Sequence, residues 1–255
     1  AVALVLLLLS IRFGTEPLST REVLSALSGE GADIPRSIVM ELRLPRALLG
    51  LLVGGGLALA GCVFQGLLRN PLAEPFILGI SGGSAAGAVL VLALGWVSAG
   101  SGVLPAAAFG GALVAIFLVF RVAAAADRTL DVRVLLLAGV VVGSFFTAVI
   151  ALILSLSEAR VVRDAVLWMM GSLYGANWAN VVVVAAYTLP AALVLLSLAR
   201  PLNLMSVGEE TASYLGTDVE RVKRVAFGVA SLITAAGVAV AGIIDSLYNF
   251  ERETV

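Results

Sequence analysis

Two arginines, Arg43 and Arg46, have the clearest chemical use in this sequence. They lie three residues apart around Pro45, which suits the first turn of a helix because its missing N–H needs no partner there. A guanidinium group presents a fork of donors that fits a carboxylate. One interpretation is that the pair receives carboxylates from another molecule. The other is that both side chains snorkel at a helix end and only place their charges in water.

A polar loop between two apolar runs, residues 200–224, contains a second candidate site. Ser206 with Glu209, and Thr217 with Glu220, have the spacing of capping boxes, which satisfy free N–H groups at helix starts. Gly216 lies between them, where a helix C-terminus favours left-handed geometry. The pattern predicts two short helices joined at Gly216, the second running into the next apolar helix. A solvated connector whose acidic groups complement helix dipoles is the alternative.

Composition excludes several function classes. Hydrophobic residues make up 60% of the 255 residues and charged residues 13%, with a mean hydropathy of +1.08, whereas an ordinary soluble domain is about 25% charged. The net charge of −1 offers no basic surface for nucleic acid. Without histidine, and with the single cysteine Cys62 in an apolar run, no disulfide, metal site or catalytic residue is expected. The only lysine, Lys223, cannot complete a phosphate-binding loop, so the chain is not expected to hydrolyse ATP.

The elements that position these residues are apolar runs long enough to cross a bilayer. We expect an all-α, polytopic membrane bundle with about seven spans, the first of which is the partial run 1–11. A short surface helix capped by Ser19 and Glu22 follows. The complete spans are predicted at residues 47–68, 76–96, 104–120, 134–156, 179–199 and 225–244.

The interiors of the complete spans carry no ionisable side chain, which disfavours coupling to protons or sodium ions and implies an external energy source. Gly50 with Gly54, and Gly79 with Gly83 and Gly87, are four residues apart, a spacing that permits close helix packing and need mean nothing more. Uncharged polar groups near membrane depth either line a path or bond to neighbouring backbones, and both interpretations stay open. They are Gln65, Asn70, Ser81, Ser84, Ser144 and Thr147.

Several motifs together resemble the permease subunits of ABC importers for iron-siderophore complexes, haem and cobalamin, the FecCD/BtuC-like family. The family carries R-L-P-R, G-x-x-x-Q, N-P-L-A-[DE]-P, a glycine-serine turn, W-[LM]-M-G-S-L-x-G-x-x-W and G-E-[ED]-x-A-x-x-L-G. In this chain they are read at residues 43–46, 61–65, 70–75, 79–83, 168–178 and 208–216.

The resemblance implies roles for most of the candidate residues. Arg43 and Arg46 would dock a periplasmic or lipid-anchored substrate-binding protein. A loop would couple the chain to an ATP-binding subunit that holds ATP and magnesium, so this chain would need no cofactor of its own. Gly139 and Gly143 would lie on the fifth helix, which lines the path in this family. Gln65, Asn70, Ser144 and Thr147 are possible path residues because they are polar, and not because of the resemblance. The loop residues are Gly208, Glu209, Glu210, Ala212, Leu215 and Gly216.

The resemblance also implies a second permease copy, a surrounding lipid bilayer and a multi-pass location in a bacterial or archaeal inner membrane. Arginine and lysine divide eight against eight between the two sets of loops, so the positive-inside rule does not decide the orientation. The family's pattern places the N-terminus inside and Arg43 and Arg46 outside. Which chelate is carried is open.

The resemblance ends near residue 244, where the family continues into about three more helices of a total near ten. Residues 245–255 form a divergent polar tail, which we interpret as a sign of truncation after a permease domain at residues 1–244. Three functional interpretations follow. They are an ABC importer permease, which is favoured, a channel or secondary carrier, and a non-functional permease fragment.

Overall fold

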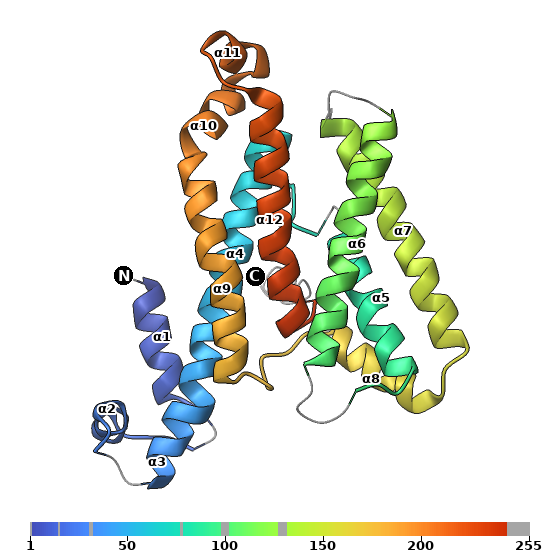
Figure 1. The fold of residues 1–255 in the computed structure, drawn as a ribbon. Coiled ribbons are helices and arrows are strands. Elements are labelled where there is room, and N and C mark those ends of the chain that lie inside the picture. The colour runs from blue at the N-terminus through green and yellow to red at the C-terminus, as the bar shows by residue number, and fades with distance from the viewer. Residues whose placement is uncertain are drawn as a thin grey trace, which may run out of the picture. The chain divides into compact units, whose positions relative to one another are not determined.

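The computed structural model describes residues 2–14, 16–30, 33–76, 79–97, 102–126 and 132–243, and all regular structure in these ranges is helical (Figure 1). The residues group into two compact units. The first comprises residues 1–55 and 173–186, and the second comprises residues 56–172 and 187–255. The predicted polar tail at 245–255 lies outside the described residues.

The first unit gathers short helices beside the first half of a long one. Its helices are α1 (Val2–Arg12), α2 (Thr20–Ser28), α3 (Asp33–Ser37), the π-helical η1 (Ile38–Arg43), the first half of α4 (Leu44–Leu68) and the start of α9 (Trp178–Ser197). A small core of Ile11, Val23, Ala26 and Val39 holds them together.

The predicted capping box at the start of α2 is confirmed. The Glu22 N–H donates to the Ser19 hydroxyl, and the Glu22 carboxylate accepts the Ser19 N–H at 2.7 Å. The Ser19 hydroxyl also donates to that carboxylate. Hydrogen bonds from the side chain and then the backbone of Ser19 lower the pKa of Glu22 below its ordinary value of 4.5, because they favour the charged form.

The second unit contains the larger core. Phe64 of α4 and Phe227 of α12 are both fully buried, and their ring centroids lie 5.5 Å apart. Besides the later halves of α4 and α9, the helices of this unit are α5 (Ile80–Ala93), α6 (Val103–Ala126), α7 (Val132–Ser155), α8 (Ala159–Met169), α10 (Ala199–Val207), α11 (Glu209–Tyr214) and α12 (Val219–Ala241).

Five helices of the described chain are long and apolar enough to cross a membrane. Their ranges are Asp33–Leu68, Val103–Ala126, Arg133–Ser155, Trp178–Ser197 and Val219–Ala241. The predicted span at residues 76–96 is represented by α5, an apolar helix of 14 residues, and the partial first run by α1 with 11 residues. The all-α membrane bundle expected from the sequence is therefore confirmed.

The predicted stop after residue 68 is also confirmed. α4 ends at Leu68, and the Asn70 side chain accepts the N–H of Leu72 at 3.0 Å, a local turn that competes with helix. Gly79 then opens α5 with φ +68°, a left-handed conformation that glycine adopts without strain.

Glycines bring α5 and α6 into backbone contact. A Cβ placed on Gly87 would lie 2.2 Å from the carbonyl oxygen of Ala107, and one placed on Gly83 would lie 2.5 Å from the carbonyl oxygen of Gly111. Carbon atoms cannot approach that closely, so only glycine fits at these positions. The predicted glycine series therefore serves helix packing in lipid, where van der Waals contact replaces the hydrophobic effect.

The two capping boxes predicted in residues 200–224 are wrong in detail. Ser206 stays in the last turn of α10, where its hydroxyl donates to the carbonyl of Asn203, and the N-cap of α11 is Gly208 without a side-chain cap. The cap of α12 is Asp218, not Thr217, and its carboxylate accepts the Arg221 N–H at 3.1 Å. An ionised carboxylate is a stronger acceptor than a hydroxyl at a helix start.

Candidate functional site

A helical tip made of α10, α11 and the turn at residues 215–218 stands at one end of the second unit (Figure 1). The predicted junction at Gly216 is confirmed, because this glycine has φ +84°. The Thr217 N–H donates to the Ala212 carbonyl and the Gly216 N–H to the Ser213 carbonyl, which closes the end of α11. Glycine at this point lets the chain reverse within a few residues and enter α12.

The helical tip presents apolar side chains to its surroundings. Val207 is 78% exposed, Tyr214 90% and Leu215 64%, while Ala212 is fully buried and anchors α11. Glu209 and Glu210 occupy the first turn of α11. The tip lies between two membrane-length helices and belongs to neither, so exposed apolar side chains here indicate a contact surface for another protein or for the membrane surface.

One ion pair joins α11 to α12. The Lys223 ammonium lies 2.5 Å from the Glu209 carboxylate. Lys223 is 4% exposed and is the one charged residue that is buried in the described part of the chain. The sequence identified Lys223 only as the single lysine. The first residues of α12, VERVKR, are mostly charged, and nothing in that pattern showed which of them would be buried and paired.

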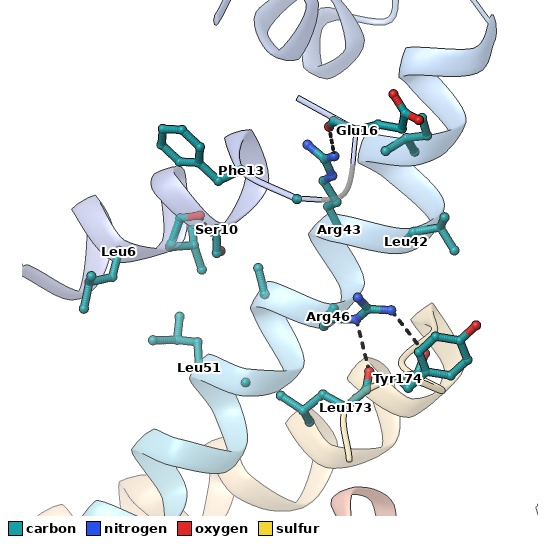
Figure 2. A pocket seen from close by; sticks show the side chains of 15 residues that line it. Leu6, Ser10, Phe13, Glu16, Leu42, Arg43, Arg46, Leu51, Leu173 and Tyr174 are labelled. Carbon is teal, nitrogen blue, oxygen red and sulfur yellow. Dashed lines mark hydrogen bonds between the residues drawn. The ribbon is translucent and has the colours of Figure 1, made fainter. Parts of the chain in front are cut away.

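In the first unit, Arg43 bonds to backbone carbonyls. Its guanidinium donates to the carbonyls of Ile11 and Arg12, each at 3.0 Å. It also donates to the carbonyl of Glu16, the bond drawn in Figure 2. The first two carbonyls are at the C-terminal end of α1, where the helix leaves them without internal partners and where its dipole favours a positive charge. Arg43 therefore secures the end of α1.

Arg46 reaches a different segment of the same unit. It donates to the Leu173 carbonyl at 3.2 Å and to the Tyr174 carbonyl at 3.3 Å, and its guanidinium lies 5.7 Å from the centre of the Tyr174 ring (Figure 2). Arg46 is exposed whereas Arg43 is half-buried. Both arginines line a groove of about 840 Å³ with side chains of α1, η1 and α4.

The residues expected to line a path do not form one polar cluster. The Gln65 amide donates to the Ala73 carbonyl at 3.4 Å, and Asn70 forms the turn after α4. On α7, Ser144 and Thr147 are exposed, and the Thr147 hydroxyl donates to its own helix at Gly143.

Gly139 and Gly143 pack against the start of α5. A Cβ on Gly79 would lie 3.0 Å from the Gly143 nitrogen and 3.1 Å from the Gly139 carbonyl oxygen, so the spacing of the two glycines serves helix packing. Ser84 is fully buried, and its hydroxyl has no hydrogen-bond partner among the described residues.

A close backbone crossing at the far end of α12 was not predicted. A Cβ on Gly242 would lie 2.5 Å from the Trp168 carbonyl oxygen and 2.7 Å from the Gly171 Cα. The Ser172 N–H donates to the Ala241 carbonyl at 2.8 Å. Gly171 and Gly242 both have left-handed φ angles, so the glycine within the tryptophan-containing motif is explained by this crossing.

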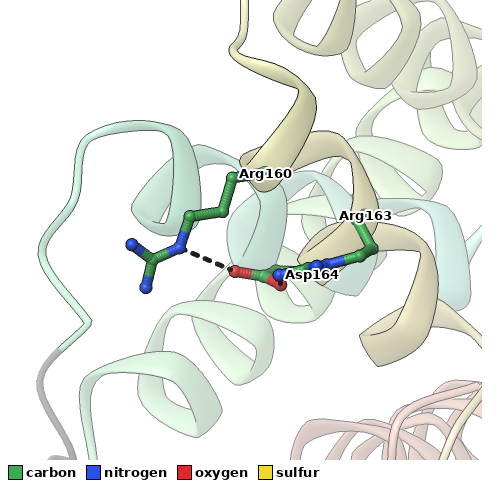
Figure 3. A network of polar contacts seen from close by, with 3 residues as sticks. All are labelled: Arg160, Arg163 and Asp164. Atoms are coloured by element: carbon green, nitrogen blue, oxygen red, sulfur yellow. Dashed lines mark hydrogen bonds and ion pairs between the residues drawn. The ribbon is translucent and has the colours of Figure 1, made fainter.

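The amphipathic helix α8 carries a small charged network (Figure 3). Asp164 lies 3.8 Å from the Arg160 Nε and 3.5 Å from an Arg163 nitrogen. Both arginine side chains are mostly exposed, so these ion pairs contribute at most about 1 kcal/mol each. No group of three His, Cys, Asp or Glu residues suitable for a metal ion occurs in the described ranges.

Comparison with known proteins relates the chain to one family. The model of the FecCD transport family matches residues 2–245. A cobalamin import permease of Halobacterium salinarum is 44% identical over 81% of this chain and 55% of its own length. An iron(3+)-hydroxamate import permease of Bacillus subtilis is 33% identical over 95% of this chain and 74% of its own length. A hemin transport permease of Yersinia pestis is 35% identical over 81% of this chain and 62% of its own length.

A solved structure has the same fold. It is an inward-facing metal-chelate type ABC transporter, 27% identical in sequence, and it superimposes with a TM-score of 0.82 over 99% of this chain and 78% of its own. The chain spans 55% of the cobalamin permease, so it matches little more than half of that relative. The family consists of transport permeases, which are not themselves enzymes.

Proposed function

Since the chain belongs to the FecCD transport family, we propose that it is a membrane-spanning permease subunit of a binding-protein-dependent ABC importer in a bacterial or archaeal inner membrane. In this role it supplies a path across the bilayer, and a separate ATPase supplies the energy. In this proposal ATP and magnesium are held by that partner, because no phosphate-binding loop can be written around Lys223, the single lysine of the sequence.

The proposed cargo is a bulky metal chelate. The relatives are named for cobalamin, iron(3+)-hydroxamate and hemin import, and these ligands share a large organic frame around a metal. The spans of this chain are rich in uncharged side chains, and a mostly uncharged path suits cargo of this class. In this proposal Gln65, Asn70, Ser144 and Thr147 line part of the path, and Gly139 and Gly143 shape α7.

The helical tip is the observation that carries the proposal. Residues 208–216 match the family's ATPase-coupling motif, and α11 presents Tyr214 and Leu215 outward while Ala212 holds it against the unit. A helix of six residues with exposed apolar side chains at its end fits a cleft on another protein. We assign this surface to the ATP-binding subunit.

A test uses one exposed leucine of the tip and a matched control. Leu215→Asp puts a charge on the proposed contact without disturbing the buried core, whereas Leu156→Asp puts the same charge on an exposed residue just after α7. We expect Leu215→Asp to abolish co-purification with the ATPase and ATP-driven uptake, and Leu156→Asp to retain both. Uptake by both variants in proteoliposomes without ATP would contradict the proposal and would favour a carrier or channel.

A second partner in the proposal is a substrate-binding protein. Of the two arginines, Arg46 is the better candidate to receive a carboxylate, since it is exposed and its carbonyl contacts are long at 3.2 and 3.3 Å. Arg43 already donates to three backbone carbonyls, and in this proposal it holds the end of α1 in place beside Arg46. A second permease copy completes the path in this proposal, as the family's architecture implies.

Binding-protein affinity would show whether the arginines act as proposed. We expect Arg46→Glu to weaken binding more than Arg46→Gln does, because the first adds repulsion while both remove the guanidinium. The melting temperatures of the two variants should be similar, since both lose the same internal contacts. Equal affinities for the wild type and both variants would exclude Arg46 from the docking surface.

A further inference from the structure

We propose that the ion pair between Glu209 and Lys223 is the positioning contact that couples the helical tip to α12 during transport. The inference rests on the proposed function, because it assumes that a partner ATPase acts on the tip. It adds a residue outside the family's coupling motif, Lys223, and gives Glu209 a specific task within it.

The geometry of the pair indicates a fixed contact between α11 and α12, which we call the strut and which consists of Glu209 and Lys223. The Lys223 ammonium and the Glu209 carboxylate are 2.5 Å apart, which is a direct charge-assisted hydrogen bond. Lys223 is 4% exposed, whereas the Glu209 side chain is 38% exposed. The ammonium is therefore held inside the protein, and the carboxylate reaches in from the tip to meet it.

Lys223 is poorly placed without its partner. It lies in the second turn of α12, near the positive end of the helix dipole, where a cation is disfavoured. An ammonium removed from water also loses its hydration, and only a well-aligned opposite charge compensates for that loss. Glu209, at the first position of α11, is favoured by the dipole of its own helix. The pair thus ties the start of one helix to the start of the other.

α11 packs mainly against α10 and has fewer contacts with α12. The helix has six residues, of which Ala212 is the buried one, and its N-cap Gly208 makes no side-chain bond. A left-handed glycine, Gly216, joins it to α12. Because α11 has few contacts with α12, we expect a push on Tyr214 or Leu215 to reach α12 chiefly through the side-chain contact that joins the two helices.

By contrast, α12 is buried and is held by contacts at several points along its length. It is the most buried of the membrane-length helices in the described ranges, since 67% of its most apolar 18-residue stretch is buried inside the structure. Phe227 packs against Phe64 in the core. At its far end the Ala241 carbonyl accepts the Ser172 N–H, and Gly242 crosses Gly171 in backbone contact. Helices that are packed in this way can pass a movement along their length by changing between two packed arrangements.

The unequal burial of the two residues provides a variant that should fold. In Lys223→Met the buried charge is replaced by an apolar chain of similar length, and Glu209 can turn to water because it is partly exposed. Glu209→Gln instead leaves an ammonium buried without a counter-charge, which is the destabilising half of such a pair. Lys223→Met therefore separates coupling from folding, and Arg224→Met, at the next, exposed position of α12, is the matched control.

The experiment measures substrate uptake and ATP hydrolysis in the same proteoliposomes, which contain the complete transporter with its ATPase and binding protein. We expect Lys223→Met to bind the ATPase as the wild type does but to transport at least about 5-fold less substrate per ATP hydrolysed, the lower end of typical coupling between sites. Arg224→Met should keep the wild-type ratio. The double variant Glu209→Lys with Lys223→Glu should recover coupling relative to Lys223→Met, a result that loss of packing alone would not produce.

The outcomes distinguish the two proposals. If the wild type neither binds an ATPase nor takes up substrate with ATP, the proposed function itself fails. If the wild type is active and Lys223→Met keeps the wild-type ratio of transport to hydrolysis, the strut is refuted and the permease assignment is unaffected. Failure of both Lys223→Met and the charge-exchanged variant to assemble would also overturn the inference, because it requires the first to be tolerated.

Discussion

Replacing Gly111 by alanine is expected to force α5 and α6 apart, whereas the same change at the adjacent Gly110 should be harmless. A Cβ at position 111 would lie 2.1 Å from the carbonyl oxygen of Gly83 and 3.2 Å from the Gly87 Cα, while a Cβ at position 110 meets no atom within 4 Å. The obstacle is the backbone of another helix, so no change of side-chain rotamer can relieve it.

The expected difference follows from the clash alone. Each variant gains about 1 kcal/mol of helix propensity over glycine, and this gain cancels when the two are compared. Overpacking of a close-packed interior costs about 1–3 kcal/mol, and a gap of about 1 Å along the seam also forfeits roughly a quarter to a half of the local dispersion energy. Gly111→Ala should therefore melt roughly 2–12 °C below Gly110→Ala.

Thermal unfolding of the two detergent-solubilised variants, followed under identical conditions, measures this difference directly. A parallel measurement on Gly87→Ala tests the same seam one helical turn away, where the carbonyl of Ala107 is the obstacle. Indistinguishable melting temperatures for Gly111→Ala and Gly110→Ala would refute the argument that backbone contact holds α5 and α6 together.

Three further predictions concern a helix cap and a backbone crossing. Ser19→Ala should destabilise α2 by about 1 kcal/mol, which hydrogen exchange of its first amides measures. Because the folded-state pKa of Glu22 is lowered, its contribution is present above the unfolded value of 4.5 and is lost as pH falls through the folded value. Wild-type protection of α2 should thus decline as the pH falls below 4.5 and through the lower folded-state pKa, and it should decline more than that of Ser19→Ala. An equal decline in both proteins would contradict the linkage. Gly242→Ala should lower the melting temperature, since φ at this position is +73° and the new Cβ would lie 2.5 Å from the Trp168 carbonyl oxygen. Gly228→Ala is the control, because a Cβ there would meet no atom within 4 Å. Equal melting temperatures for the two variants would argue against the crossing.

The sequence predicted the features that depend on local chemistry. Long apolar runs gave the spans, because a bilayer sets their length and composition, and Asn70-Pro71 gave the end of α4. The Ser19 capping box and the left-handed Gly216 were also predictable, since each depends on residues a few positions apart. Ser206 was assigned wrongly because α10 continues to Val207 and keeps that hydroxyl inside its last turn.

The features that sequence patterns missed depend on contacts between distant segments. Lys223 meets Glu209 across two helix boundaries, and Gly171 meets Gly242 although several helices separate them in the chain. The helix α8 could have been recognised, because Val161, Val162 and Ala165 recur at helical spacing between polar residues. The carbonyl partners of Arg43 and Arg46 could not, since backbone acceptors leave no mark in a sequence. The roles of these arginines in docking stay predictions.

The bond between Ser172 and Ala241 also bears on the order in which the chain is assembled. The ribosome synthesises α8 and Ser172 before α9 to α12. The acceptor of the Ser172 N–H, the Ala241 carbonyl, belongs to α12, which is the last of the described helices to be synthesised. Until α12 enters the membrane, that N–H needs a different hydrogen-bond partner, because an unpaired backbone donor is too costly to bury. The segment at residues 171–172 therefore completes its structure after insertion of the bundle, and a defect in α12 would appear as exposure of this distant loop during biogenesis.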